Sequence, residues 1–430
     1  MRWLGVALAI AGLLACGSGK KRQSRTHDGG AVEPIATPNF GTDGGTAKTT
    51  AADEIEPNDN DDVAMPLPLA GTIHGRIDPE SDADYYRIEV ATAGALAIEV
   101  SAVDNTDLTL EVKDPTGTTI AKSDRGAAKT KEGVPNVGVQ PGRYIAIVRT
   151  KKIPVKGKAP KKPATPPPAL PYDITAQVAP VASHAEREPD DDRGTANDLI
   201  VGDPMSGYIG WTGDTDVWKL SIETLSAKNV IDIEIGSVEG VAFGLEIADG
   251  VGQVLAQRKA PRGAGLVVRG LLPVVAAGSP PFHYLTIKGT PSNHESPYSL
   301  RVTARNPEPD AEVEPNDTLE KPMAIPSDRT VVNGQWTPGD IDCFAVAPDV
   351  AARTLDVTVD VPPEADLSVE LVVDGKVAAK SDVKGKGAAE KVSAPVPSNG
   401  RAVVRVRGAD SGAEGAYEIK VTEGPPEKAH

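Results

Sequence analysis

Apolar and polar residues alternate along most of this chain in short runs, as they do in β-strands that bury one face. Clear runs occupy residues 96–100, 231–235 and 355–359. Successive side chains of a strand point to opposite faces, so each run buries its apolar side and leaves the other in water. Turn-forming sequences such as those at 114–117 and 374–375 separate the runs, as antiparallel hairpins require. The pattern predicts an all-β protein of antiparallel, two-sheet β-sandwiches.

An acidic motif at the start of the strand-rich regions occurs three times. The sequence EIEPND at residues 54–59 returns as EREPDD at 186–191 and as EVEPND at 312–317. Two further aspartates follow each copy at one constant distance; they are Asp82 and Asp84, Asp214 and Asp216, and Asp340 and Asp342. Two motifs held at one spacing indicate an internal repeat. We therefore predict three tandem sandwich domains, over residues 53–180, 186–305 and 312–424.

The first copy combines Glu-Pro-Asn-Asp, Asp-x-Asp-Tyr-Tyr, a Pro-Gly-Arg-Tyr turn and a closing Tyr-x-Ile strand. In this combination the chain resembles the bacterial pre-peptidase C-terminal domain, a jelly-roll-like β-sandwich appended to secreted peptidases and other exported proteins. The third copy keeps Glu-Pro-Asn-Asp but has Cys343 and Phe344 where the family prefers aromatic residues. The second copy is the most divergent, because Asp190 replaces the asparagine and Trp218 follows Val217.

The repeated acidic residues form a candidate calcium site in each domain. Alternate side chains of an extended segment share a side, so Glu54, Glu56 and Asn58 are expected to converge. Calcium prefers six to eight oxygen ligands of this kind, and the resemblance implies calcium because binding members of the family use the equivalent residues. The alternative is a solvated, metal-free turn. The predicted ligands are Glu54, Glu56, Asn58, Asp59, Asp82, Asp84, Glu186, Glu188, Asp190, Asp191, Asp214, Asp216, Glu312, Glu314, Asn316, Asp317, Asp340 and Asp342.

The first 15 residues are expected to be an export signal. Arg2 precedes an apolar run at residues 3–14, which is too short to cross a bilayer. The run resembles a bacterial lipoprotein signal peptide cleaved before Cys16, which implies a lipid on that cysteine; an ordinary secretory signal is the alternative. Residues 16–52 lack a hydrophobic period and are expected to form a flexible tether. An exported protein held by lipid at the outer membrane or cell surface follows.

Composition and motifs exclude several other functions. A formal net charge of −16, with no basic stripe among aromatic residues, argues against nucleic-acid binding. The six histidines lack the spacing of zinc ligands. No metalloprotease, nucleophile-elbow, P-loop or dinucleotide motif occurs, so we expect no enzyme activity. The second cysteine, Cys343, lies in an alternating run and is expected to pack as a small apolar side chain.

These observations predict a non-catalytic cell-envelope lipoprotein whose calcium-stabilised domains bind or space an extracellular protein or polysaccharide. An accessory or inhibitory subunit of a secreted peptidase is the alternative that the resemblance suggests. The lysine- and proline-rich segment 151–171 is either an unstructured loop or a docking site for an anionic polymer. Trp211 and Trp336 are either core residues or stacking platforms for a sugar.

Overall fold

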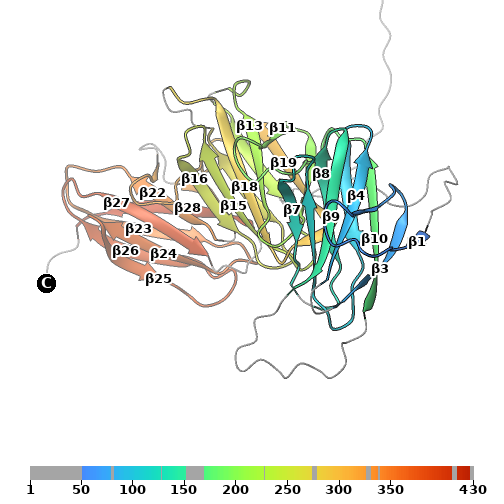
Figure 1. Ribbon diagram of the computed structural model, residues 1–430. Helices are drawn as coiled ribbons and strands as arrows, with labels where there is room; N and C mark the ends of the chain where they lie inside the picture. Colours follow the sequence, from blue (N-terminus) through green and yellow to red (C-terminus); the bar gives the residue numbers. More distant parts are fainter. Residues whose placement is uncertain are drawn as a thin grey trace, which may run out of the picture. The chain divides into compact units, whose positions relative to one another are not determined.

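The computed structural model describes residues 51–78, 82–126, 128–151, 169–226, 228–273, 278–325, 331–337, 339–408 and 414–426. These residues form strands and turns and contain no helix, so the predicted all-β fold is confirmed (Figure 1). Within this part of the chain nothing has the length and hydrophobicity of a membrane-crossing helix. Cys16 and most of the segment 151–171 lie outside the described residues.

The first sandwich, residues 51–179, consists of two facing sheets. One sheet has the order β1-β3-β10-β5-β8 and the other the order β2-β4-β9-β6-β7. Neighbouring strands are antiparallel, except that β1 and β2 run parallel to β3 and β4. The strands are β1 (Ala51–Asp53), β2 (Met65–Pro66), β3 (Thr72–Ile77), β4 (Ala83–Val90), β5 (Gly94–Val100), β6 (Leu108–Lys113), β7 (Thr119–Ser123), β8 (Glu132–Val139), β9 (Gly142–Thr150) and β10 (Leu170–Ala179).

The second sandwich, residues 185–305, repeats this strand order. Its sheets are β12-β19-β14-β17 and β11-β13-β18-β15-β16. Each strand therefore has a counterpart in the first sandwich, for example β16 for β7 and β17 for β8. The strands are β11 (Asn197–Leu199), β12 (Pro204–Ile209), β13 (Thr215–Ser221), β14 (Val230–Ile235), β15 (Ala242–Asp249), β16 (Val254–Lys259), β17 (Leu266–Leu271), β18 (Phe282–Thr290) and β19 (Asn293–Arg305).

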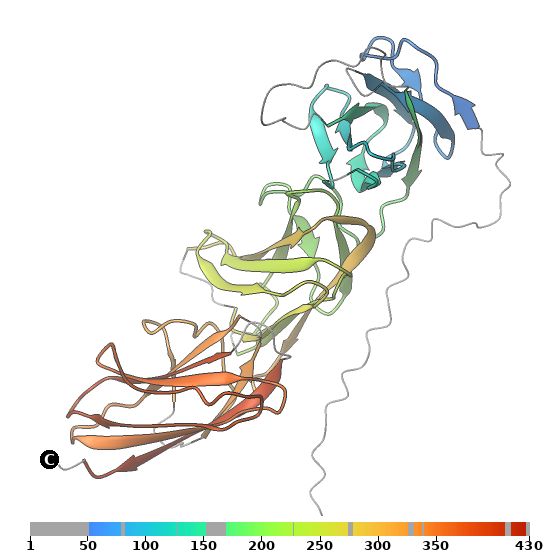
Figure 2. The same cartoon turned by 90° about the horizontal axis from the view of Figure 1, so that it is seen from below.

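The third sandwich, residues 311–424, has the same order again, with sheets β21-β28-β23-β26 and β20-β22-β27-β24-β25. Figure 2 shows this sandwich, in orange and red, as two layers of strands. The strands are β20 (Met323–Ala324), β21 (Val331–Trp336), β22 (Ile341–Val346), β23 (Arg353–Asp360), β24 (Leu367–Val373), β25 (Lys376–Ser381), β26 (Glu390–Val396), β27 (Ala402–Gly408) and β28 (Gly415–Gly424).

Each sandwich has its own hydrophobic core between its two sheets. Strand β5 alternates buried and half-buried residues along its length, which is the pattern that predicted it. Trp336 is fully buried in the third core, and Trp211 is 8% exposed and packs with the core residues of the first sandwich. Neither tryptophan presents a free stacking platform for a sugar. Cys343 is buried with Val372 and Val403, as its apolar surroundings in the sequence predict.

The acidic segments join consecutive sandwiches through their backbones. The amide of Gly138 in β8 donates to the carbonyl of Glu188 at 2.7 Å, and the amide of Glu188 donates to the carbonyl of Asn136 at 3.1 Å. The next junction is built alike, because Leu272 N donates to Glu314 O at 2.8 Å and Glu314 N donates to Gly270 O at 3.0 Å. Both segments thus run parallel to an edge strand of the preceding sandwich, β8 or β17. Both strands, β8 and β17, also contain a register shift at this point.

Candidate metal centres

Each sandwich brings its two acidic motifs together at the start of one of three corresponding strands, β4, β13 or β22. In each Glu-x-Glu segment the backbone amide of the first glutamate donates to a backbone carbonyl in the strand that precedes β4, β13 or β22. The donor and acceptor pairs are Glu54 and His74, Glu186 and Ser206, and Glu312 and Asn333. The residue after the second aspartate then donates its amide to the carbonyl of the Asn or Asp at the end of the segment, over 2.9–3.2 Å. Three acidic clusters result, which we call the first, second and third cluster.

A buried tyrosine hydroxyl lies in each cluster. It comes from the closing strand of each sandwich, as Tyr172, Tyr298 or Tyr417, and donates to Asp84, Glu186 or Asp342 respectively. A glycine in the neighbouring strand makes room for the ring. A Cβ at Gly75 or Gly334 would lie 2.4 or 2.0 Å from the tyrosine Cζ, and a Cβ at Gly207 would lie 2.0 Å from Glu186 Oε2. Nothing in the sequence indicates this polar role of the tyrosines.

The first cluster is partly open to solvent. Oxygen atoms of Glu56, Asp82 and Asp84 lie within 4.8 Å of one another. Asp84 is fully buried, and burial raises its pKa to about 8. The side chain of Asn58 is also fully buried, and neither its amide nitrogen nor its carbonyl oxygen has a hydrogen-bond partner among the described residues. Glu56 is exposed, so this cluster is a partial cage with one solvent-facing ligand.

Two predicted ligands of the first cluster point elsewhere. Glu54 accepts hydrogen bonds from the Arg76 amide at 2.6 Å and from the Tyr86 hydroxyl at 3.0 Å, and it is not part of the three-carboxylate group. Asp59 is exposed. The structure therefore brings together Glu56, Asn58, Asp82 and Asp84 more closely than the other predicted ligands.

The second cluster is deeply buried. Glu186, Glu188 and Asp214 are each 2% exposed, and Asp190 and Asp216 are fully buried. Oxygen atoms of Glu188, Asp190 and Asp216 lie within 4.8 Å of one another. Four of the oxygens have no hydrogen-bond partner among the described residues; these are Glu188 Oε1, Asp190 Oδ1 and both oxygens of Asp216. Only Asp191 of the predicted set is exposed.

Neutral donors alone surround the second cluster. Asn136 of the first sandwich donates its side-chain amide to Glu186 at 2.7 Å, and the Gly210 amide donates to Asp214 at 2.5 Å. No lysine or arginine forms an ion pair with these carboxylates in the described part of the chain. Burial, followed by the neighbouring carboxylates, raises the pKa of Glu188 and Asp216 well above the ordinary range. Burial also raises the pKa of Asp214 to about 7.

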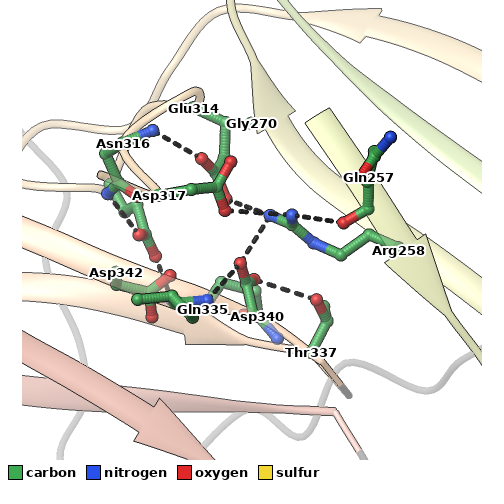
Figure 3. A network of polar contacts seen from close by, with 12 residues as sticks. Gln257, Arg258, Gly270, Glu314, Asn316, Asp317, Gln335, Thr337, Asp340 and Asp342 are labelled. Atoms are coloured by element: carbon green, nitrogen blue, oxygen red, sulfur yellow. Dashed lines mark hydrogen bonds and ion pairs between the residues drawn. The ribbon is translucent and has the colours of Figure 1, made fainter. Parts of the chain in front are cut away.

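The third cluster contains the corresponding carboxylates, except that Asn316 stands at the position of Asp190, and it contains in addition an arginine. Figure 3 shows Arg258, from β16 of the second sandwich, reaching into the cluster. Its Nη2 lies 2.6 Å from Glu314 Oε1 and 2.5 Å from Asp340 Oδ1, and its Nη1 lies 3.0 Å from Asp317 Oδ1. Oxygens of these three carboxylates form one group within 4.8 Å, and Glu312, Glu314 and Asp342 form a second. Arg258 was not a predicted site residue.

Local hydrogen bonds occupy most of the remaining oxygens of the third cluster. Glu312 accepts from the Asn316 side chain at 2.6 Å and from the Gln335 amide at 2.7 Å. Asp340 accepts from the Thr337 hydroxyl at 2.9 Å. Burial raises the pKa of Glu312 to about 8 and that of Asp317 to about 6. The three clusters thus share one backbone plan but differ in exposure and in positive charge.

Comparison with known proteins adds two structural matches. No protein-family model matches the chain, and no curated protein does. Among solved structures it matches the pre-peptidase C-terminal domain of collagenase from Bacillus anthracis at 16% identity, over 26% of this chain and 94% of that one, with a TM-score of 0.21. It also matches a predicted secreted protein from Eubacterium rectale at 10% identity, over 57% of this chain and 80% of that one, with a TM-score of 0.19.

The donor atoms decide which ion fits the clusters. All the grouped side chains in the three clusters are carboxylates, and no histidine or cysteine belongs to a group among the described residues. Hard cations such as calcium prefer oxygen ligands, whereas zinc prefers nitrogen and sulfur. Buried carboxylates with unpartnered oxygens fit a cation in the second cluster, and Asn58 and Asp84 fit one in the first. In the third cluster a guanidinium already contacts three of the carboxylates.

Proposed function

We propose that this chain is a non-catalytic, exported β-sandwich protein in which calcium, bound at the junction of two sandwiches, sets their relative geometry. It serves as a spacer or binding module for an extracellular protein or polysaccharide, held to a membrane through a lipid on Cys16. Export and anchoring rest on the signal-like residues 1–15 and on the cysteine that follows them. The calcium role rests on the second cluster.

The observation that supports calcium is the uncompensated charge of the second cluster. Five carboxylates lie there at 2% exposure or less, and four of their oxygens have no partner among the described residues. Burying an ionised carboxylate is very unfavourable unless it is paired with a cation or bound to a metal. Burial and the neighbouring carboxylates raise the pKa values of these groups, so that without a cation they tend to take up protons. A divalent ion removes both the desolvation penalty and the mutual repulsion.

The position of the second cluster supports a role at the junction. Glu188 pairs through its backbone with β8 of the first sandwich, and Glu186 accepts a hydrogen bond from Asn136 of that sandwich. Asp190 and Asp216 belong to the second sandwich. An ion bound by Glu188, Asp190 and Asp216 therefore ties the segment that touches the first sandwich to the body of the second. Calcium outside the cell would keep this connection stiff.

A thermal melt tests the proposal. The chain from residue 16, with Cys16→Ser, is melted by calorimetry in calcium and in chelator. Calcium at 100 times its dissociation constant should stabilise by about 2.7 kcal/mol per site. Asp216→Asn should remove the second sandwich's share, whereas the matched control Asp191→Asn, at an exposed position of the same segment, should retain it. Identical melts of the parent chain in calcium and in chelator would refute the calcium role.

Small-angle scattering tests the junction role separately. If calcium stiffens the connection between the first and second sandwiches, then chelation should broaden the distribution of interatomic distances while circular dichroism stays unchanged. The Asp216→Asn variant should give the broad distribution in calcium as well. If the scattering is the same with and without calcium, then calcium does not stiffen the connection between the two sandwiches, even if it binds there.

A further inference from the structure

We propose that Arg258 is a built-in cation that closes the third cluster to metal, so that the junction between the second and third sandwiches holds without calcium. This inference extends the proposed function, because it divides the three similar acidic clusters into two that take a metal and one that does not. The argument rests on the contacts of Arg258, on its burial, and on the strand position from which it comes.

The contacts of Arg258 place its charge among the would-be ligands. One guanidinium nitrogen lies within 2.6 Å of oxygens of both Glu314 and Asp340, and another lies 3.0 Å from Asp317. These three carboxylates form one of the two groups of the third cluster whose oxygens lie within 4.8 Å of one another, and Glu314 also belongs to the other group, with Glu312 and Asp342. A divalent ion in that group would sit beside a fixed positive charge, and the repulsion between the two is strong away from water. Arginine cannot relieve it by losing a proton.

Burial keeps the guanidinium of Arg258 among these carboxylates. The side chain of Arg258 is 2% exposed, and those of Glu314 and Asp340 are each 3% exposed. A buried arginine that loses its partners is left as an uncompensated charge, which is strongly destabilising. Displacing Arg258 by a metal would therefore require the guanidinium to reach water. Its backbone belongs to β16, one residue before the end of the strand, which holds the start of the side chain in place.

The strand register shows that arginine at this position is peculiar to the second sandwich. Arg258 in β16 pairs with Leu245, and the corresponding residues are Ser123 in β7 and Ser381 in β25. Each serine donates to a buried glutamate at the start of the next strand, Glu132 or Glu390.

In the second sandwich both the serine and the glutamate of this pair are replaced by other residues. The residue at the glutamate position is Leu266, as its pairing with Ile235 shows. Arg258 thus has no carboxylate partner at the place where its sandwich would otherwise supply one, and its charged end contacts the next sandwich. The first sandwich has only a serine here, so the second cluster receives no corresponding cation.

The test compares Arg258→Gln with Arg269→Gln in chelator. Arg269 joins Glu234 to Glu414 of the third sandwich but touches no acidic cluster, which makes it a matched control. In chelator, Arg258→Gln should lower the melting temperature of the third sandwich by about 10 °C or more, and Arg269→Gln by less than about 3 °C. Arg258→Lys, which keeps a positive charge, should recover part of the loss. Equal effects of the two glutamine variants would overturn the proposal.

Calcium stoichiometry gives the second readout. Titration calorimetry of the chain with Arg258 intact should be insensitive to Glu314→Gln, whereas Arg258→Gln should bind one more calcium ion per chain and regain its melting temperature in calcium. A loss of one bound calcium caused by Glu314→Gln alone would overturn the proposal. If the parent chain binds no calcium at all, the proposed function fails, but the comparison in chelator still decides the role of Arg258.

Discussion

The second and third clusters are made from the same motif positions on corresponding strands, yet their charges are balanced in different ways. Among the described residues, Asp214 accepts hydrogen bonds from the backbone amides of Gly210 and Thr215 alone, whereas its counterpart Asp340 contacts the guanidinium of Arg258. One part of the difference lies in the acidic motif, where Asn316 stands at the position of Asp190. The other part lies in the preceding sandwich, which offers Asn136 to one cluster and Arg258 to the other. A repeated acidic motif therefore does not by itself produce a repeated balance of charge.

The largest expected effect is an opposite response of these two aspartates to the same substitution. In chelator at pH 7, Asp214→Asn should stabilise the second sandwich by about 1–3 kcal/mol, because it removes a buried carboxylate that is costly to protonate or to charge. Asp340→Asn should destabilise the third sandwich by about 1.5–3 kcal/mol, because it removes one of the three charged hydrogen-bond partners of buried Arg258. Calorimetry of both variants checks the pair of signs. If both substitutions stabilise, or both destabilise, their sandwiches, then the charges of the two clusters are not balanced in different ways.

A second prediction concerns the pair of Ser123 and Glu132 in the first sandwich, whose serine position is occupied by Arg258 in the second sandwich. Burial raises the pKa of Glu132 to about 7, above its ordinary value of 4.5, so the folded state holds a proton that the unfolded state releases. The first sandwich should therefore be most stable below pH 4.5 on this account and lose up to about 3 kcal/mol as the pH rises to 7. Glu132→Gln should flatten that slope, as measured by amide hydrogen exchange in β5 and β10 in saturating calcium.

The control for this pH experiment is Glu89→Gln, on the surface of the same sandwich. Its slope should match that of the parent chain. If Glu132→Gln leaves the slope unchanged, then the buried glutamate is not the group that responds to pH, and its absence from the second sandwich has no electrostatic significance.

The smallest expected effect is at Asn136, the neutral counterpart of the arginine contact. Asn136→Ala removes a hydrogen bond of 2.7 Å to buried Glu186 and should lower the stability of the second sandwich by about 1–2 kcal/mol. The corresponding residue of the next junction is Gly270, which has no side chain to lose. Calorimetry in calcium checks the value. A loss as large as that expected for Arg258→Gln would mean that the two junctions do not differ in the nature of their contacts.

The sequence was sufficient to predict the strands and the pairing of the acidic motifs, because both follow from local alternation and constant spacing. The run at 231–235 lies within β14 and that at 355–359 within β23. The exposure of Asp59 and Asp191 was not predictable, since one position along an extended segment decides which way a side chain points. Arg258 was also missed, because in the sequence it is one of several polar residues in a strand. Only the register, which aligns it with Ser123 and Ser381, distinguishes it.

The backbone bridge between Glu188 and β8 has a consequence for aggregation. Strand β8 is the outermost strand of its sheet, and the Glu188 segment covers part of its free hydrogen-bonding groups. Exposed strand edges are templates on which other chains add strands. If calcium loss loosens that segment, the uncovered β8 becomes a site for association between copies. Depletion of the metal should thus reduce colloidal stability before any sandwich unfolds.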